Sequence, residues 1–227
     1  MATQAKPRRK VPRAVREGQM LEVARRTFGT RGYHDVSMDE IAEAVGISKP
    51  MLYAYFDSKE GLFLACMGQA ANELVESIRR GVTEAPTPEL RLFRGLLAVF
   101  DFVEESGESW RILYPYGPLS AGPFAAAAAG ARDAMAGLLT ELLTGNAVAE
   151  GVDEEVATET EPLAHALTGA TIAMASWWLE HPSEPRELMV LRLMNFAWMG
   201  LGDLIEGRLW ELPRDWSPPE ERGKGEE

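Results

Sequence analysis

Apolar residues recur three and four positions apart along most of the chain, which is the spacing of a helix with one buried face. Clusters of proline and glycine separate these stretches, and no internal repeat is evident. The pattern predicts an all-α protein built from successive amphipathic helices.

One pair of short helices is defined by its ends. Ser37 to Glu40 reads S-x-x-E, a capping box that starts a helix. Ile41, Ala42 and Val45 follow on one narrow apolar face, and Gly46 ends the helix because glycine accepts the left-handed conformation there. A sharp turn is therefore predicted after Val45.

The next helix is predicted over Lys49–Phe56. Ser48 is placed to cap it, and Pro50 falls in its first turn, where a missing amide proton costs nothing. Leu52 and Phe56 share the inner face, since they are four residues apart. A short helix, a tight turn and a second helix form the arrangement that reads DNA in a major groove.

The outward positions carry groups suited to DNA. Hydroxyls, a lysine and free amides at a helix start bind phosphates, while Lys49 and Met51 can reach base edges. Asp57 to Glu60 reads as a further cap, and Lys59 in that first turn opposes the helix dipole, so we expect a phosphate partner for it. The predicted DNA-binding residues are Ser37, Ser48, Lys49, Pro50, Met51, Tyr53, Tyr55 and Lys59.

From Met20 to Phe63 the chain resembles the N-terminal domain of TetR-type transcriptional regulators. The resemblance rests on elements in a fixed order: Leu21, Ala24 and Phe28, then Gly32-Tyr33, Ile41-Ala42, Gly46, Tyr53, Phe56, Lys59 and Leu62. Pro50 and Met51 stand where many relatives have small residues, which bears on the operator sequence. The resemblance implies a homodimeric, all-helical regulator, usually a repressor that a small ligand releases from DNA.

Charge is divided unevenly along the chain. Residues 1–65 hold 11 Lys/Arg and 8 Asp/Glu, whereas the remaining residues hold 12 and 27. Only the N-terminal part therefore suits a polyanion, and binding to DNA should weaken steeply with salt. The first basic stretch, which includes Arg13 and Arg16, has two readings, an arm that reaches DNA and a solubilising tail.

The body is predicted as further helices. The first is a long linking helix, which is the natural lever between the reading head and the rest of the chain. The expected segments are helices over Lys59–Arg80 and Glu89–Glu104, a short aromatic segment over Trp110–Tyr116, an alanine-rich helix from Pro123 to Leu143, a loop over Gly145–Asp153, a helix over Glu159–Glu180 and a last helix after Pro185.

The last two helices form an antiparallel pair with more apolar surface than one partner covers. Packing against a second copy gives a four-helix interface, and by resemblance this pair is where TetR-type dimers meet. The alternative is that these stripes are monomer core. The predicted dimer residues are Ala170, Met174, Trp177, Leu191, Asn195, Trp198, Gly202 and Ile205.

A ligand site is expected among large apolar and polar-tipped side chains of the body, for a hydrophobic inducer that is neutral or cationic. The alternative for each residue is ordinary core packing. The aromatic cluster around Trp110 departs most from a regular packing stripe. The candidates are Phe102, Trp110, Tyr114, Tyr116, Phe124, His165, Met174 and Trp178.

Other classes find little support. The chain has no nucleophile elbow, phosphate-binding loop or dinucleotide fingerprint, so an enzyme is not expected. The single Cys66 and three scattered histidines offer no disulfide framework or zinc site, and no cofactor is expected. With no signal peptide or membrane span predicted, we expect a cytoplasmic protein.

Together these features predict an all-α protein with an N-terminal three-helix helix-turn-helix DNA-binding domain and a larger C-terminal helical ligand-binding and dimerisation domain. The alternatives are a helical protein-interaction module and a regulator that needs no ligand. The expected divisions are a basic arm over residues 1–12, the DNA-binding domain over 13–60, the helical domain over 61–211 and a tail over 212–227.

Overall fold

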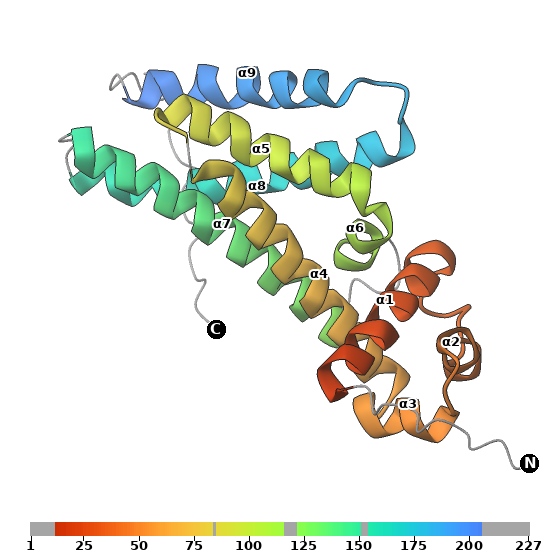
Figure 1. Ribbon diagram of the computed structural model, residues 1–227. Coiled ribbons are helices and arrows are strands. Elements are labelled where there is room, and N and C mark those ends of the chain that lie inside the picture. The colour runs from red at the N-terminus through yellow and green to blue at the C-terminus, as the bar shows by residue number, and fades with distance from the viewer. Residues whose placement is uncertain (1–11, 84, 116–121, 151–153, 206–227) are drawn as a thin grey trace, which may run out of the picture.

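The computed structural model describes residues 12–83, 85–115, 122–150 and 154–205, and every regular element among them is a helix. Three helices form a compact unit, called the head, and a long fourth helix runs from it into the rest of the molecule (Figure 1). These are α1 (Arg13–Arg31), α2 (Met38–Val45), α3 (Lys49–Phe56) and α4 (Lys59–Val82).

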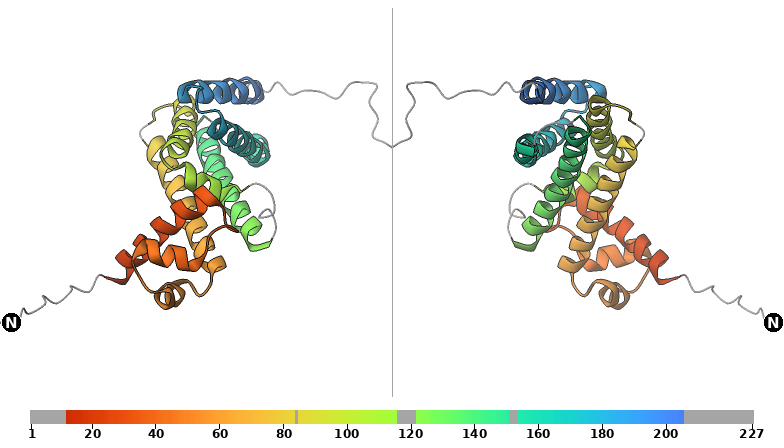
Figure 2. Two further views of the ribbon diagram at one scale, coloured as in Figure 1. Left: turned by 90° about the vertical axis from the view of Figure 1, so that its right-hand side faces the viewer. Right: turned by 90° about the vertical axis from the view of Figure 1, so that its left-hand side faces the viewer.

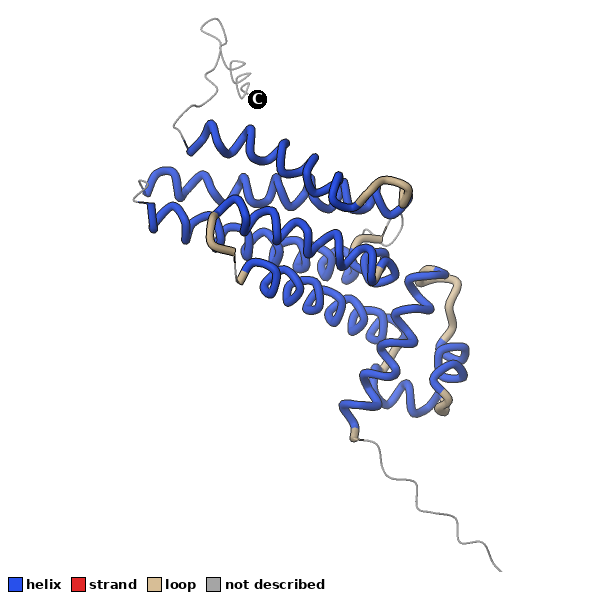
Figure 3. The backbone as a smooth tube through the Cα atoms, turned by 45° about the horizontal axis from the view of Figure 1, so that its top comes forward, coloured by secondary structure: helices blue, strands red, loops and turns tan. Residues whose placement is uncertain are grey.

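Five further helices form the body. Its helices are α5 (Pro88–Glu105), α6 (Gly107–Leu113), α7 (Gly122–Glu150), α8 (Glu154–Glu180) and α9 (Arg186–Ile205). Of these helices, α5, α6 and α7 pack against α4, whereas α8 and α9 pack mainly against other body helices. The head and α9 lie at opposite ends of the molecule (Figure 2). Figure 3 shows the body as a helical bundle.

The turn between α2 and α3 follows from local chemistry. The Ser37 hydroxyl accepts from the Glu40 amide at 3.2 Å, and the Ser37 amide donates to the Glu40 carboxylate at 2.8 Å, which confirms the capping box. Gly46 has φ 76°, the left-handed conformation that ends α2. The predicted bounds Lys49–Phe56 are confirmed for α3.

Two apolar clusters lie along α4. The head cluster joins α1, α2 and α3 to the first turns of α4 as far as Met67, and Ile112 of α6 and Phe124 of α7 also belong to it. The body cluster takes α4 from Ala70 onward together with α5 to α9. Because the same rigid helix contributes to both cores, a tilt of α4 in the body moves the head.

Two boundary predictions are wrong. The chain is helical through Glu150, although a loop was predicted from Gly145. One glycine costs a helix only about 1 kcal/mol, which the good helix formers around it offset. Asp57 does not start α4 but ends α3 with φ 58°, and the Ser58 hydroxyl caps α4 by accepting from the Gly61 amide at 2.9 Å.

Candidate nucleic-acid interface and ligand cavities

The outer face of α3 is open to solvent at the end of the molecule opposite α9 (Figure 1). Leu52 and Phe56 are buried against the head, as predicted, while Lys49, Pro50 and Tyr53 are exposed. Tyr53 leaves 38% of its surface accessible, which is unusual for so large a side chain. An exposed aromatic hydroxyl beside a lysine is suited to phosphate contact.

Lys49 is held by a neighbouring carboxylate. Its Nζ atom donates to Asp39 of α2 at 2.7 Å, and both side chains are exposed. This hydrogen bond, together with the Asp39 charge, raises the pKa of Lys49, so the lysine is fully charged at neutral pH. An exposed pair of this kind contributes little to stability, so a phosphate can replace Asp39 at small cost.

Two other predicted DNA-binding residues are only partly open. Met51 and Tyr55 are half-buried and pack against the head core. Arg16 of α1 approaches the Met51 sulfur at 3.5 Å, and the Arg13 guanidinium lies 5.0 Å from the centre of the Tyr55 ring. Arg13 and Arg16 thus belong to α1 rather than to a mobile arm, and they place two cations beside α3.

Lys59 has partners within the protein. Its Nζ atom lies 4.5 Å from the centre of the Tyr33 ring and 3.4 Å from the carbonyl oxygen of His34. A cation over an aromatic face is stabilised without any phosphate. The position of a cation in the first turn of α4 is therefore explained by Tyr33, which the sequence pattern alone did not indicate.

The two serines differ in state. The Ser37 hydroxyl is engaged in the capping box, and hydrogen bonds from the Ser37 amide and then from Arg31 lower the pKa of Glu40 to about 2. Ser48 is the N-cap residue directly before α3, but its side chain makes no capping hydrogen bond, contrary to the sequence prediction. The exposed Ser48 hydroxyl is therefore not committed to the helix end.

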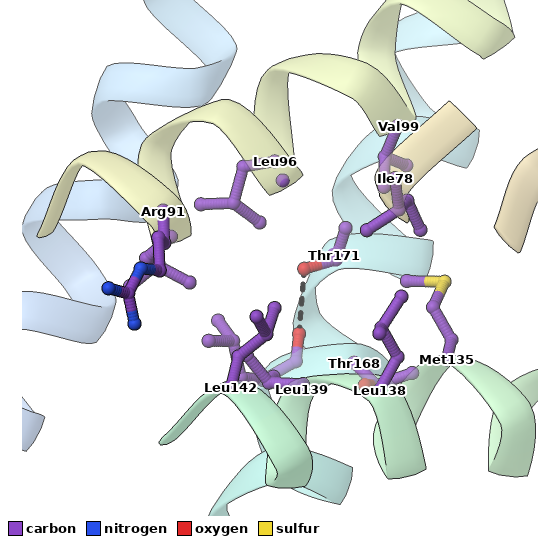
Figure 4. A pocket seen from close by; sticks show the side chains of 13 residues that line it. Ile78, Arg91, Leu96, Val99, Met135, Leu138, Leu139, Leu142, Thr168 and Thr171 are labelled. Atoms are coloured by element: carbon purple, nitrogen blue, oxygen red, sulfur yellow. Dashed lines mark hydrogen bonds between the residues drawn. The ribbon is translucent and has the colours of Figure 1, made fainter. Parts of the chain in front are cut away.

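An apolar cavity, called the body cavity, lies between α4, α5, α7 and α8 (Figure 4). Its volume of about 40 Å³ is close to that of one water molecule in the liquid. Thr168 lines this cavity, and its hydroxyl is buried and has no hydrogen-bond partner. The Thr171 hydroxyl, by contrast, donates to the Leu167 carbonyl at 2.8 Å. The other lining residues are Ile78, Arg91, Leu92, Gly95, Leu96, Val99, Met135, Leu138, Leu139, Leu142 and Leu167.

A larger cavity, called the junction cavity, lies where α1 of the head meets α4, α6 and α8. Its volume is about 310 Å³. Aromatic rings from the head and the body face it, with Arg111 and Glu180 also on its lining. The sequence pattern pointed only to the part of its wall around Trp110, because the other walls come from helices far apart in the chain.

The predicted ligand residues do not converge on one cavity. Trp110 and Tyr114 line the junction cavity. Phe102 is buried in the body cluster, Phe124 packs between Tyr33 and Phe63 at ring distances of 4.9 Å, and Trp178 packs against Phe100.

Of the remaining three ligand candidates, the structure describes two. Met174 is half-buried, and His165 is exposed; neither residue lines the body cavity or the junction cavity. His165 therefore does not belong to either cavity, since helical spacing turns it to the solvent side of α8. Tyr116 lies outside the described residues.

The α8/α9 face presents apolar side chains to solvent. Trp177 and Leu191 are 43% and 50% exposed, and Phe196, which the sequence reasoning omitted, is 67% exposed. Asn195 is exposed as well, while Ala170 and Met174 are half-buried. The side chains of Trp198, Gly202 and Ile205 lie outside the described part of the chain.

A helix-turn-helix head with an open second helix, joined by one rigid helix to a helical body, defines a DNA-binding transcriptional regulator. The family model for bacterial regulatory proteins of the tetR family matches residues 20–66. The model for the tetracyclin repressor-like C-terminal domain matches residues 86–200. The chain belongs to the TetR family.

Known relatives agree over most of the chain. The HTH-type transcriptional activator FasR of Mycolicibacterium smegmatis is 30% identical over 193 residues, which is 85% of each chain. A TetR-like transcriptional regulator from Rhodococcus sp. RHA1 is 33% identical, with a TM-score of 0.68 over 85% of this chain and 99% of that one. FadR from Bacillus subtilis, solved in complex with stearoyl-CoA, has a TM-score of 0.69 over 79% and 96%, and at 14% identity shows the shared fold. These relatives are regulators rather than enzymes.

Among the described residues, no helix combines the length and the apolar character that are needed to span a bilayer.

Proposed function

We propose that this protein is a homodimeric regulator that binds a palindromic operator through two heads and leaves it when a small hydrophobic ligand enters the body. The observation that carries the DNA-binding role is the open face of α3, where Lys49 and Tyr53 are exposed beside a capped and rigid α2. A head that no longer bound DNA would have no functional need for exposed Lys49 and Tyr53 side chains.

The residues on and beside the exposed face of α3 are expected to make two kinds of contact with DNA. Ser37, Ser48, Tyr53 and Lys59 suit phosphates, while Lys49, Pro50 and Met51 at the start of α3 enter the groove first. To contact DNA, the Lys59 ammonium group must either leave the Tyr33 ring or donate through an N–H that does not face the ring. We therefore expect Lys59 to contribute less to DNA binding than Lys49. Arg13 and Arg16 add cations that flank Tyr55 and Met51.

Dimerisation is supported by the exposed apolar side chains of α8 and α9. Trp177, Leu188, Leu191 and Phe196 are all more than a third exposed. Large apolar groups gathered on two neighbouring helices mark an interaction surface. A second copy is the natural partner, because two half-sites spaced by a turn of DNA require two heads fixed relative to each other.

A ligand is supported by the body cavity and its position. Ile78 of α4 lines the cavity, so any molecule that widens it pushes on the helix that leads to the head. The lining is nearly all apolar, apart from Arg91 and the unpartnered Thr168 hydroxyl, which suits a hydrophobic ligand with one polar group. At about 40 Å³ the cavity must widen to accept such a ligand. The ligand therefore binds the protein with the widened cavity more tightly than the protein with the closed cavity, and a switch requires this difference in affinity.

In this account the unliganded dimer binds DNA with the body closed, and it acts as a repressor where its operator overlaps a promoter. The relative FasR is named as an activator. The sign of regulation depends on where the operator lies relative to the promoter, so a promoter fusion with the operator placed upstream or downstream distinguishes the two. Since its partner is chromosomal DNA, we place the protein in the cytoplasm.

The DNA-binding role is tested by single substitutions on a labelled duplex. Lys49→Ala is expected to change sequence preference and to reduce the slope of log affinity against log salt by about one. Tyr53→Phe is expected to weaken binding to every sequence. Arg80→Ala removes one positive charge from the far part of α4 and serves as the control. If Lys49→Ala and Tyr53→Phe both bind DNA like the wild type and the Arg80→Ala control, the protein-interaction alternative is favoured instead.

The ligand role is tested by screening neutral and cationic apolar compounds for release of the operator. A compound that acts through the body cavity is expected to release the wild-type protein but not the Leu139→Trp variant, in which the indole fills the space. Release of both proteins places the ligand elsewhere, and release of neither by any compound favours a ligand-independent regulator.

A further inference from the structure

The junction cavity has the size and lining of a binding site and is separate from the body cavity. Its volume of about 310 Å³ falls at the lower end of the range of small-molecule pockets. Filled with water it would hold on the order of ten molecules at about 30 Å³ each.

Aromatic rings dominate the walls. Phe28 and Tyr33 come from the head and Phe63 comes from the first turns of α4, and their rings lie 5.1 to 6.0 Å apart. Trp110 and Tyr114 come from α6 and the residue after it, with ring centres 4.7 Å apart. Rings spaced in this way accept a further flat ring in offset or edge-on contact.

One buried side-chain polar atom among the lining residues has no hydrogen-bond partner. Tyr114 is only 8% exposed, and its hydroxyl is buried without a hydrogen bond. Burial raises the pKa of Tyr114 to about 12, so the phenol keeps its proton at neutral pH and is available as a donor. By contrast, the Trp110 N–H already donates to the Ser176 hydroxyl at 3.0 Å.

We propose that the junction cavity binds a small, flat, neutral aromatic molecule that carries one hydrogen-bond acceptor, and that the Tyr114 hydroxyl donates to this acceptor. The lining carries one arginine and one glutamate, Arg111 and Glu180, and so has no excess of either charge. This site goes beyond the proposed function, in which the ligand enters the body cavity.

The junction cavity is lined by residues of both the head and the body. Gly29 and Thr30 at the end of α1 line the cavity on one side, and Ser176 and Leu179 of α8 line it on the other. A bound molecule therefore contacts the head and the body at once, where α1 meets α6.

The test uses coumarin, a flat neutral two-ring compound with a carbonyl acceptor, and the side-chain N–H signals of the full-length protein labelled with nitrogen-15. The Trp110 signal, assigned from Trp110→Phe, is expected to shift with coumarin in a saturable way. The Trp178 N–H donates to the Glu184 carbonyl, lines neither cavity and is expected to stay in place.

Three variants locate the ligand. Tyr114→Phe is expected to weaken coumarin binding about three- to ten-fold, the worth of one neutral hydrogen bond. Tyr33→Phe keeps the ring of a partly exposed lining residue and removes a phenol hydroxyl that is not among the buried atoms without a partner, and it is expected to bind like the wild type. Thr168→Val changes only the body cavity and is also expected to bind normally.

Thr30→Phe, which places a ring at the cavity wall, is expected to abolish the shift while the protein keeps its melting temperature. The proposal is overturned if the Trp110 signal does not move up to the solubility limit of coumarin. It is equally overturned if Tyr114→Phe and Tyr33→Phe bind alike, or if binding survives Thr30→Phe and is lost in Thr168→Val. Should Thr30→Phe fail to fold, the two tyrosine variants still decide the question.

Discussion

Gly29 of α1 and Glu108 of α6 touch with no space for a side chain between them. A Cβ atom on Gly29 would stand 2.5 Å from both the Cβ and the carbonyl oxygen of Glu108. One turn earlier on α1, Arg25 donates to the Ser109 hydroxyl of α6 at 2.8 Å. The head is thus held on the body by a close backbone contact and a polar clamp side by side.

The close contact predicts the effect of one methyl group. Gly29→Ala is expected to destabilise the protein by about 1–3 kcal/mol, because the clash involves backbone atoms that cannot swing away. The melting temperature should fall by several degrees. Gly18→Ala in the same helix meets open space and is expected to stabilise by about 0.5–1 kcal/mol. Equal melting of the two variants would show that α1 and α6 are not in contact.

Arg25 and Arg26 make a matched pair. Arg25 is largely buried and bonds Glu73 of α4 at 2.8 Å as well as Ser109, whereas Arg26 is exposed and pairs only with Glu22. Arg25→Met is expected to cost about 1.5–3 kcal/mol of unfolding free energy, and Arg26→Met less than about 1. Urea unfolding of both proteins checks the difference, and an equal loss in both would remove Arg25 as a clamp.

Glu40 gives a pH prediction. The Ser37 amide and Arg31 lower its pKa from an ordinary value of 4.5 to about 2. A lowered pKa in the folded state means that the ionised carboxylate stabilises α2 above about pH 4.5, and that this stability is lost as the pH falls toward 2. The stability gap between wild type and Glu40→Gln should therefore be constant near neutrality and shrink below pH 4.5. A gap that is unchanged down to pH 2 would contradict the capping role.

Phe196 tests the interface. This side chain is 67% exposed, which makes it the most open of the large apolar side chains in the described part of the chain. A symmetric dimer contains two copies of Phe196, so one substitution changes the interface at two places. Phe196→Asp is expected to weaken dimerisation at least about 100-fold, which sedimentation at micromolar concentration would show as a monomer. Val15→Asp changes an exposed valine of α1 and is expected to leave the dimer intact. A wild-type monomer would refute the interface altogether.

The head could be predicted from sequence because its signals are local. Ser37, Gly46 and Pro50 act on the backbone within a few residues, so their spacing alone sets the ends of α2 and α3. Lys59 shows the limit of this reasoning. Its partner Tyr33 is far away in the chain, and only the packed head brings the ring beneath the amine.

The cavities could not be predicted for the same reason. Thr168 and Leu96 meet across the body cavity from helices that are separated by α6 and α7 in the chain. Helical spacing predicts which side of a helix is buried, but it does not tell whether a buried side chain lines a cavity or fills the core. Phe102 and Trp110 were both candidates by sequence, with the aromatic cluster around Trp110 the stronger one, and of the two only Trp110 lines a cavity.

The central claim is that a dimer of this chain recognises a palindromic DNA site through α3. The most direct measurement is selection of bound sequences from random duplex DNA, followed by titration of the enriched duplex at several salt concentrations. The account predicts one enriched site with two inverted half-sites, bound by two chains, and an affinity that falls steeply as salt rises. Absence of any enriched sequence at low salt, with the protein folded and dimeric, would contradict it.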